Sequence, residues 1–240
     1  MERKIVLLCI PYAGATANCY NDWKSKLPQY VELHTIELAG HGKRFNESLY
    51  QNFTEVIEDL YISILPVIHN RVYCLFGHSM GCLLAYELVH LLQQRNCNMP
   101  RHLFFSGNIP PFSINRKLNI STLSDQKLAD LLLQLGGIPE GLIRHQEYMK
   151  LFLPIIRNDF LLIDNYQYRQ LLVPAPFTVL YADEDKWNPL SDMFKWAELA
   201  TQECEMKMFK GNHFFVHSCA DEVLKLIYNK INDIDMALRI

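Results

Sequence analysis

The sequence predicts an α/β fold: a mainly parallel β-sheet with helices on both faces. Two observations support this class. Half of the 240 residues are hydrophobic, which suffices for a substantial core. Strand-like and helix-like segments alternate along the chain, as they do where helices connect parallel strands. No internal repeat, low-complexity tract or linker interrupts the alternation, so residues 1–240 are interpreted as one domain.

Six apolar runs are the expected strands. They are Ile5–Ile10, Val31–Leu38, Val72–Phe76, His102–Ser106, Phe177–Tyr181 and Glu205–Phe209. The third run is rich in β-branched and aromatic residues, which suits a buried parallel strand. The expected helices are Ser48–Ile68, Met80–Gln94, Leu190–Thr201 and Ala220–Ile231.

About 70 residues separate the fourth expected strand from the fifth, far more than a crossover helix needs. A helix start at Leu123-Ser124-Asp125, leucines at helical spacing up to Leu135 and a stop at Gly136-Gly137 indicate structure in this interval. We therefore expect a helical lid inserted at about residues 112–172. The alternative is a second packing layer without substrate contact, but long structured insertions favour the lid.

The segment Phe76-Gly77-His78-Ser79-Met80-Gly81 joins an expected strand to an expected helix. It has the G-x-S-x-G pattern of a nucleophile elbow, in which the serine occupies a strained strand-to-helix turn. Gly77 and Gly81 suit that turn because backbone and helix crowd together there. Ser79 is therefore the expected nucleophile, and the alternative is a serine that only caps the helix.

A serine hydroxyl is a poor nucleophile until an oriented base accepts its proton. After such an elbow, the acid and then the histidine follow in the chain. His213 follows the last expected strand through a turn, which places it at the carboxyl edge of the sheet, where ligands bind in such folds. His217 is the less favoured alternative. The acid is expected just after the preceding strand: Asp185, with Asp183 in reserve.

Acyl transfer also requires N–H donors where the oxyanion develops. One is expected to be the backbone N–H of Met80, directly after Ser79. The second is assigned to the N–H of Ala13, in the small-residue loop Pro11–Ala15 after the first strand. The alternative for this loop is an ordinary turn at a strand end.

The composition limits the kinds of binding partner and cofactor that we expect. The formal net charge of −3, with both signs mixed along the chain, gives no electrostatic reason to expect nucleic-acid binding. The seven cysteines are scattered and no Cys/His cluster has zinc-site spacing, so we expect a reduced, cytoplasmic protein without a metal or a bound cofactor. No apolar run has the features of a signal peptide or the length of a membrane span, so no membrane association is expected.

The sequence resembles a stand-alone type II thioesterase of nonribosomal peptide and polyketide biosynthesis over nearly its full length. The motifs that carry the resemblance are Ile10–Gly14, Gly40-His41-Gly42, Phe76–Gly81, Leu135–Pro139, Phe152-Leu153-Pro154, Arg157-Asn158-Asp159, Ala182–Asp185 and Gly211–Phe214. Two positions depart from the family pattern. Ala15 stands where a second glycine is common, and Ala182 where glycine is usual, which leaves the choice between Asp183 and Asp185 open.

The resemblance implies an α/β-hydrolase core with a helical lid, a Ser79–His213–Asp185 triad and an oxyanion hole at Ala13 and Met80. It also implies the substrate, acyl groups held as thioesters on the phosphopantetheine arm of carrier proteins. Family members hydrolyse misprimed or stalled acyl groups and so restore the synthase. An acyl or peptidyl carrier protein is thus the expected partner of a monomeric enzyme, and the phosphopantetheine belongs to that partner.

Three other functions fit parts of the pattern: a general carboxylesterase, an acyltransferase that passes the acyl group to an amine or alcohol, and a non-catalytic carrier-binding scaffold. Carrier proteins are acidic, so a docking surface should carry cations. Arg101, Arg116, Lys117 and Arg144 are expected around the lid and are the candidates for that surface.

Overall fold

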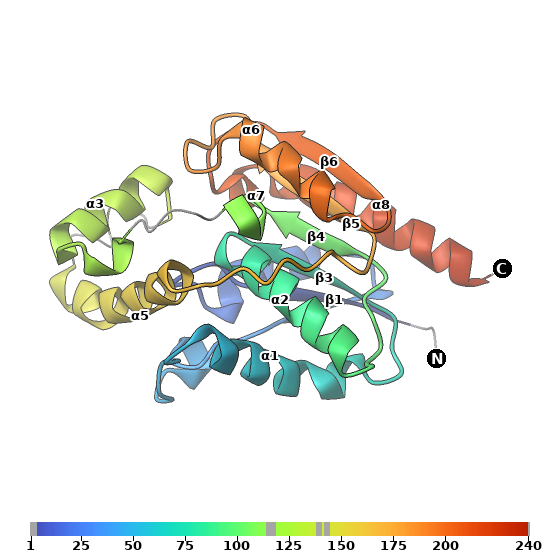
Figure 1. Cartoon of the computed structure of the whole chain (residues 1–240), viewed down its shortest axis with the longest axis horizontal. Coiled ribbons are helices and arrows are strands. Elements are labelled where there is room, and N and C mark those ends of the chain that lie inside the picture. Colours follow the sequence, from blue (N-terminus) through green and yellow to red (C-terminus); the bar gives the residue numbers. More distant parts are fainter. Residues whose placement is uncertain (1–3, 114–118, 138–140, 142–144, 240) are drawn as a thin grey trace.

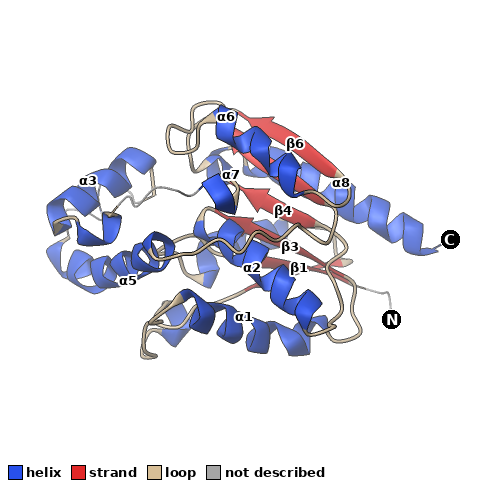
Figure 2. Ribbon diagram, in the orientation of Figure 1, coloured by secondary structure: helices blue, strands red, loops and turns tan. Residues whose placement is uncertain are grey.

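The strands form one parallel sheet. A computed structural model describes residues 4–113, 119–137, 141 and 145–239. Six strands lie in the order β2-β1-β3-β4-β5-β6, and every neighbouring pair is parallel. Helices pack against this sheet (Figures 1 and 2), which confirms the predicted fold class. The strands are β1 Ile5–Ile10, β2 Val31–Thr35, β3 Tyr73–His78, β4 Leu103–Ser106, β5 Phe177–Ala182 and β6 Cys204–Phe209.

The helices around the sheet are α1 Phe53–Ile68, α2 Met80–Gln94, α6 Leu190–Met193, α7 Phe215–Ser218 and α8 Ala220–Arg239. Three of them differ from the predicted segments. α1 begins at Phe53 rather than Ser48, because the Asn52 side chain accepts the N–H of Glu55 and caps the helix there. The predicted helix Leu190–Thr201 is α6 followed by a 3₁₀ helix, and α8 continues past Ile231 to Arg239.

The interior strand β1, between β2 and β3, shows how both faces of the sheet are packed. All six of its residues are buried, and alternate side chains point to opposite faces, as the pleat requires. Val6 and Leu8 pack into the core beneath α1 and α2, whereas Leu7 and Cys9 pack into the core beneath α8. An apolar run without alternation therefore serves a strand that is covered on both sides.

Two further helices, α3 (Asp125–Leu135) and α5 (Gln146–Asp164), lie between β4 and β5 in the chain. The Ser124 side chain caps α3, and Gly136 ends it in the left-handed conformation at φ 77°, as the sequence predicted. The two helices extend beyond one end of the sheet (Figure 1) and share an apolar core of their own. Its buried members are Ile120, Leu128, Ala129, Leu132, Met149, Leu153, Ile156 and Phe160.

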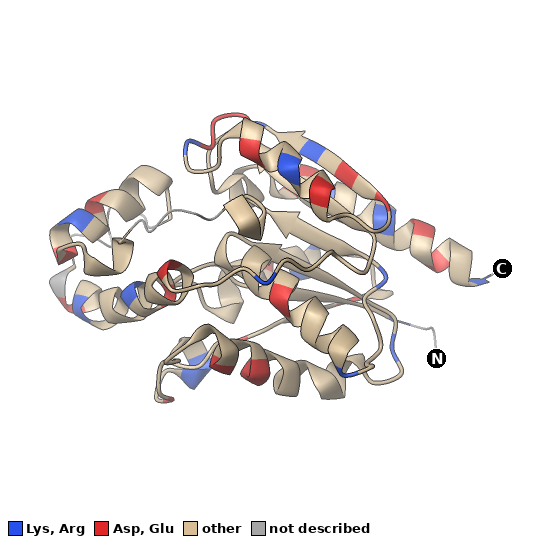
Figure 3. Ribbon diagram, in the orientation of Figure 1, with Lys and Arg blue, Asp and Glu red and all other residues tan. Residues whose placement is uncertain are grey.

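Two expectations from composition can be examined directly. All seven cysteines lie in the described part of the chain, and none forms a disulfide bond. Within residues 4–239, apart from the gaps given above, no helix combines the length and the hydropathy of a membrane span. Acidic and basic residues are interspersed along the helices (Figure 3).

Candidate active site

Ser79 lies between β3 and α2 in a strained conformation. Its φ of 54° and ψ of −117° are unusual for a residue with a side chain. Two hydrogen bonds to the Ser79 backbone maintain this geometry: the Ser79 N–H donates to the Ser106 carbonyl at 2.8 Å, and the side-chain amide of Asn108 donates to the Ser79 carbonyl at 3.0 Å. The strained turn exposes the hydroxyl at the carboxyl edge of the sheet, as the G-x-S-x-G pattern predicts.

The two glycines of this turn are required by crowding. A Cβ on Gly77 would clash with the carbonyl of Gly81, and a Cβ on Gly81 would clash with the carbonyl of Ile10 at the end of β1. With any residue larger than glycine at positions 77 and 81, α2 could not pack this closely against β1 and β3.

The structure brings Ser79, His213 and Asp185 together, although they follow three different strands. Ser79 Oγ lies 3.0 Å from His213 Nε2, and His213 Nδ1 lies 2.9 Å from Asp185 Oδ2. A carboxylate oxygen only accepts, so Nδ1 carries the proton and leaves Nε2 free to accept from the Ser79 hydroxyl. This is the arrangement in which an imidazole can remove a proton from serine.

Asp185 is buried and its carboxylate is fully engaged. Its Oδ1 accepts the backbone N–H groups of Trp187 at 2.9 Å and Asn188 at 3.3 Å, and its Oδ2 accepts the Asn188 amide at 2.9 Å. Burial raises the pKa of Asp185, but the hydrogen bond and charge of His213 and the donors of Asn188 and Trp187 outweigh burial and lower it. The carboxylate therefore stays ionised at neutral pH and keeps His213 in one tautomer.

The alternatives named from the sequence occupy other positions. Asp183 Oδ1 accepts the N–H of Gly211 at 2.9 Å, so it links the two loops that carry Asp185 and His213. His217 Nε2 lies 3.0 Å from the hydroxyl of Tyr12 rather than beside Ser79. The geometry thus favours Asp185 over Asp183 and His213 over His217.

Asn188 is a site residue that sequence reasoning missed. It is buried, and besides Asp185 its amide nitrogen donates to the Gly107 carbonyl at 3.0 Å while its Oδ1 accepts the Ile109 N–H at 3.3 Å. It therefore ties the acid loop to the loop after β4. A lone asparagine in an acidic turn carries no motif, so only the folded arrangement identifies it.

An uncharged histidine, His78, lies beside His213. His78 is fully buried, with its ring centroid 5.1 Å from that of His213, and its Nδ1 lies 2.9 Å from Ser106 Oγ. Burial lowers the pKa of His78 well below its ordinary value, and the nearby His213 and His217 lower it further. His78 is therefore neutral and does not compete with His213 for Asp185.

The two backbone groups expected to hold an oxyanion come from two different segments, the start of α2 and the turn after β1. Met80 is the first residue of α2, where N–H groups have no intrahelical acceptor and the helix dipole favours negative charge. Ala13 lies in a tight turn in which the Ala15 N–H donates to the Tyr12 carbonyl at 3.0 Å. Gly14 in this turn has a φ of 75°, which glycine adopts without strain.

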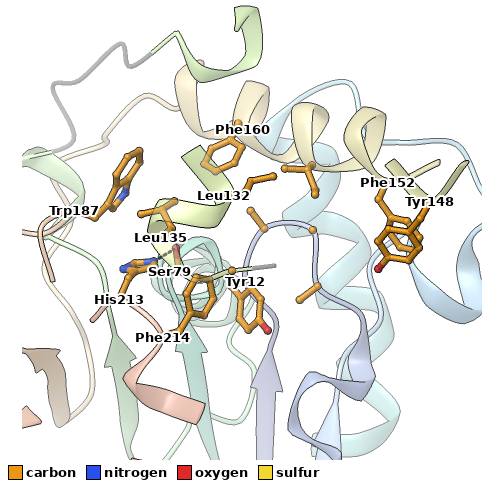
Figure 4. Close-up of a pocket in the computed structure, with 15 residues that line it drawn as sticks. Tyr12, Ser79, Leu132, Leu135, Tyr148, Phe152, Phe160, Trp187, His213 and Phe214 are labelled. Atoms are coloured by element: carbon orange, nitrogen blue, oxygen red, sulfur yellow. Dashed lines mark hydrogen bonds between the residues drawn. The ribbon is translucent and has the colours of Figure 1, made fainter. Parts of the chain in front are cut away.

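A cavity of about 130 Å³ opens beside Ser79. Its apolar wall comes from α3 and α5, and Figure 4 shows Leu132, Leu135 and Phe160 on one side of Ser79 and Tyr12 and Phe214 on the other. A second cavity of about 50 Å³ is lined by Met80 and Asn108. It shares Ser79, Phe160 and Trp187 with the first cavity. Residues of α3 and α5 therefore line the cavity that reaches Ser79.

The described residues contain no group of three or more His, Cys, Asp and Glu side chains placed to hold a metal ion. Of the four cations suggested for docking, Arg116, Lys117 and Arg144 lie outside the described residues. Placing Arg101 near the insertion was wrong: its N–H donates to the Tyr73 carbonyl at the start of β3, so it lies at the opposite edge of the sheet from Ser79.

Known proteins resemble this chain throughout its length. Residues 6–231 match the thioesterase domain family. Linear gramicidin dehydrogenase LgrE of Brevibacillus parabrevis is 31% identical over 230 residues, 94% of this chain and 87% of LgrE. ClbQ, from the colibactin NRPS/PKS pathway, superposes with a TM-score of 0.91 at 31% identity, covering 98% of this chain and 99% of ClbQ. RedJ, a thioesterase of the prodiginine pathway in Streptomyces coelicolor, superposes with a TM-score of 0.87 at 30% identity, covering 95% and 85%.

The family match, the α/β architecture and the resemblance to proteins of NRPS/PKS pathways agree with one another. They confirm the resemblance that the sequence motifs indicated. The chain belongs to the thioesterase family, a family of hydrolases that act on thioesters, and is similar to the type II thioesterases of nonribosomal peptide and polyketide biosynthesis.

Proposed function

We propose that the protein hydrolyses acyl thioesters carried on the phosphopantetheine arm of acyl or peptidyl carrier proteins, and so clears misprimed or stalled synthases. The observation that carries this proposal is the hydrogen-bonded series from Ser79 through His213 to Asp185, beside an apolar cavity roofed by α3 and α5. The similarity to ClbQ and RedJ supports the choice of carrier-bound substrates.

In the first step Ser79 Oγ attacks the thioester carbonyl while His213 Nε2 accepts its proton. Negative charge develops on the carbonyl oxygen, and the N–H groups of Ala13 and Met80 are the proposed donors to it. Asp185 stabilises the imidazolium that forms. The C–S bond then breaks, and the proton on His213 passes to the departing thiolate, which leaves an acyl-serine and the free carrier thiol.

In the second step water attacks the acyl-serine. His213 accepts a proton from that water and returns it to Ser79 as the C–O bond breaks, so the products are a carboxylic acid and regenerated enzyme. No metal or bound cofactor takes part in the proposed sequence. We propose that α3 and α5 act as a lid over the acyl group, since both helices line the cavity beside Ser79.

The proposed setting is the cytoplasm, with the enzyme acting as a monomer. The seven cysteines without disulfide bonds are consistent with a reducing compartment. Sedimentation of the purified protein at several concentrations measures the oligomeric state.

The decisive experiment compares kcat/KM for one acyl group on a carrier protein, on a short pantetheine-like thiol and on an alcohol. A large preference for the carrier supports the proposal. Equal values for carrier and short thiol would contradict carrier recognition, and a preference for the alcohol ester would indicate a carboxylesterase. The same assay with amine or alcohol acceptors present, analysed for products, detects acyl transfer in place of hydrolysis.

Two further outcomes are diagnostic. LgrE is named a dehydrogenase, so a change in nicotinamide cofactor that accompanies turnover would indicate hydride transfer rather than hydrolysis. If a fluorophosphonate fails to label Ser79 in the folded protein, a non-catalytic scaffold is the better account.

A further inference from the structure

A buried carboxylate joins the helical insertion to the turn that contains Ala13. Asp159, on α5, is fully buried. Its Oδ2 accepts the N–H of Gly14 at 2.7 Å and lies 3.0 Å from His41 Nε2. Its Oδ1 accepts no hydrogen bond from the residues that the structure describes. Neither Asp159 nor His41 has a part in the reaction steps above, although both belong to motifs that the sequence singled out.

The two ring nitrogens of His41 indicate a charged pair. Nδ1 lies 3.0 Å from the Ala39 carbonyl, which only accepts, and Nε2 lies against the Asp159 carboxylate. With the carboxylate ionised, both nitrogens must carry protons. Burial lowers the pKa of His41, but the hydrogen bond and charge of Asp159, the Ala39 carbonyl and the charge of Glu37 outweigh burial and raise it. An imidazolium thus holds the Asp159 carboxylate in place.

The hydrogen bond from Gly14 fixes the turn internally. Ala13 and Gly14 are the two central residues of the Tyr12–Ala15 turn, and the N–H of Gly14 belongs to the peptide between them. Anchoring that peptide prevents it from rotating and so holds the turn, including the adjoining Tyr12–Ala13 peptide that carries the Ala13 N–H. α5 also packs directly on the turn, because a Cβ on Gly14 would lie 2.5 Å from Cγ1 of Ile156.

The same face of α5 meets the acyl cavity. Ile156 and Phe160 line that cavity, and Asp159 lies between them in one turn of the helix. The position of α5 therefore determines both the cavity wall and the anchor of the turn.

We propose that Asp159, oriented by His41, is a positioning residue: through its hydrogen bond from Gly14 it aligns the Ala13 N–H with the developing oxyanion. This inference rests on the proposed hydrolysis through Ser79. It adds a physical coupling between the insertion and the chemical step.

The test compares Asp159→Ala with Arg157→Met on the same helix. Arg157 donates to the carbonyls of Ser121 and Leu123 and to Asp125, so its removal deletes charged contacts of α5 but leaves the hydrogen bond from Gly14 to Asp159 in place. We expect Asp159→Ala to lower kcat by a factor on the order of 10² to 10³, as for loss of one oxyanion donor, with little change in KM. Arg157→Met should keep the wild-type kcat.

A second readout separates positioning from general loss of structure. A trifluoromethyl ketone with the substrate's acyl chain adds to a reactive serine and places an oxyanion in the hole, whereas the matching methyl ketone binds without reaction. In Asp159→Ala the affinity for the trifluoromethyl ketone should fall by the same factor as kcat/KM, and the affinity for the methyl ketone should not. Equal losses for both ligands, or a folded variant with wild-type kcat, would overturn the inference.

If the Asp159→Ala protein does not fold, the same two assays are carried out on Asp159→Asn. The amide oxygen can still accept from Gly14, but a neutral acceptor is weaker, so we expect a loss in kcat on the order of tenfold with the same selectivity for the trifluoromethyl ketone. An Asp159→Asn protein equal to wild type in both assays would contradict the inference. Failure of wild-type Ser79 to form the adduct would instead contradict the proposed function, so the two failures are distinguishable.

Discussion

The loops at the carboxyl ends of the strands and the helical insertion contribute different parts of the candidate active site. Ser79, Asp185 and His213 each follow a strand, so the parallel topology brings their loops to the same end of the sheet. In the insertion, the residues that wall the cavity come from α3 and α5, whose positions depend on packing. Parallel topology therefore determines which loops meet at Ser79, whereas the packing of α3 and α5 determines the shape of the cavity beside it.

The largest effect should come from the acid at the sheet edge. Asp185→Asn should lower kcat roughly 10⁴-fold, because an amide stabilises neither the required tautomer of His213 nor its positive charge. Asp183→Asn is the matched control: it alters a carboxylate two residues away that bonds only the Gly211 N–H in the described structure. Steady-state kinetics of both variants measures the two losses in kcat. A larger loss in Asp183→Asn than in Asp185→Asn would show that Asp183 is the acid.

Asn188 tests whether the loops at this edge need mutual support. Asn188→Ala removes the donor to Asp185 and the link to Gly107. We expect kcat to fall by about 10- to 100-fold, by analogy with outer partners of catalytic groups. The stability of the variant, measured by denaturant unfolding, shows whether folding is affected. Unchanged kcat in a folded protein would exclude this role.

Leu135, on α3, should affect the selectivity for acyl length rather than the chemical step. Leu135→Trp adds bulk to the cavity wall at the end of α3, whereas Leu133 on the same turn lies outside both cavities. We expect Leu135→Trp to lower kcat/KM for long acyl groups relative to short ones by about tenfold or more. Leu133→Trp should leave that ratio unchanged. An equal loss for all chain lengths in Leu135→Trp would contradict a role of Leu135 in selectivity for acyl length.

The smallest effect on turnover concerns buried histidines in the body of the fold. Burial lowers the pKa of His90 and of His102 to about 4, and His102 Nε2 lies 2.8 Å from Thr178 Oγ1. Each is neutral when folded but titrates near 6.5 when unfolded. Above pH 6.5 these histidines therefore do not change the free energy of unfolding. As the pH falls from about 6.5 to about 4, each histidine lowers the free energy of unfolding by about 3 kcal/mol at most. Below pH 4 the histidines cause no further loss.

Denaturant unfolding of wild type and His102→Gln across this pH range measures the effect. The free energy of unfolding of the variant should depend less on pH than that of the wild type. Parallel pH curves for the two proteins would show that His102 does not remain neutral in the folded state.

The sequence predicted the sheet edge well and the insertion less completely. Apolar runs and the glycines around Ser79 locate strands and elbow, because short-range pattern determines both. The choice between Asp183 and Asp185 stayed open, since only the folded loops decide which carboxylate meets His213. Asn188 and the Asp159–His41 pair depend on contacts between distant segments, which no local pattern reports.

The account depends most directly on Ser79 as the nucleophile. Wild type and Ser79→Ala should be mixed with an acyl-carrier thioester, with turnover measured and the protein mass recorded after rapid quenching. The account predicts an acyl adduct on Ser79 in the wild type, no adduct in the variant and a loss in kcat of roughly 10⁴-fold or more. Wild-type turnover by a folded Ser79→Ala protein would contradict it.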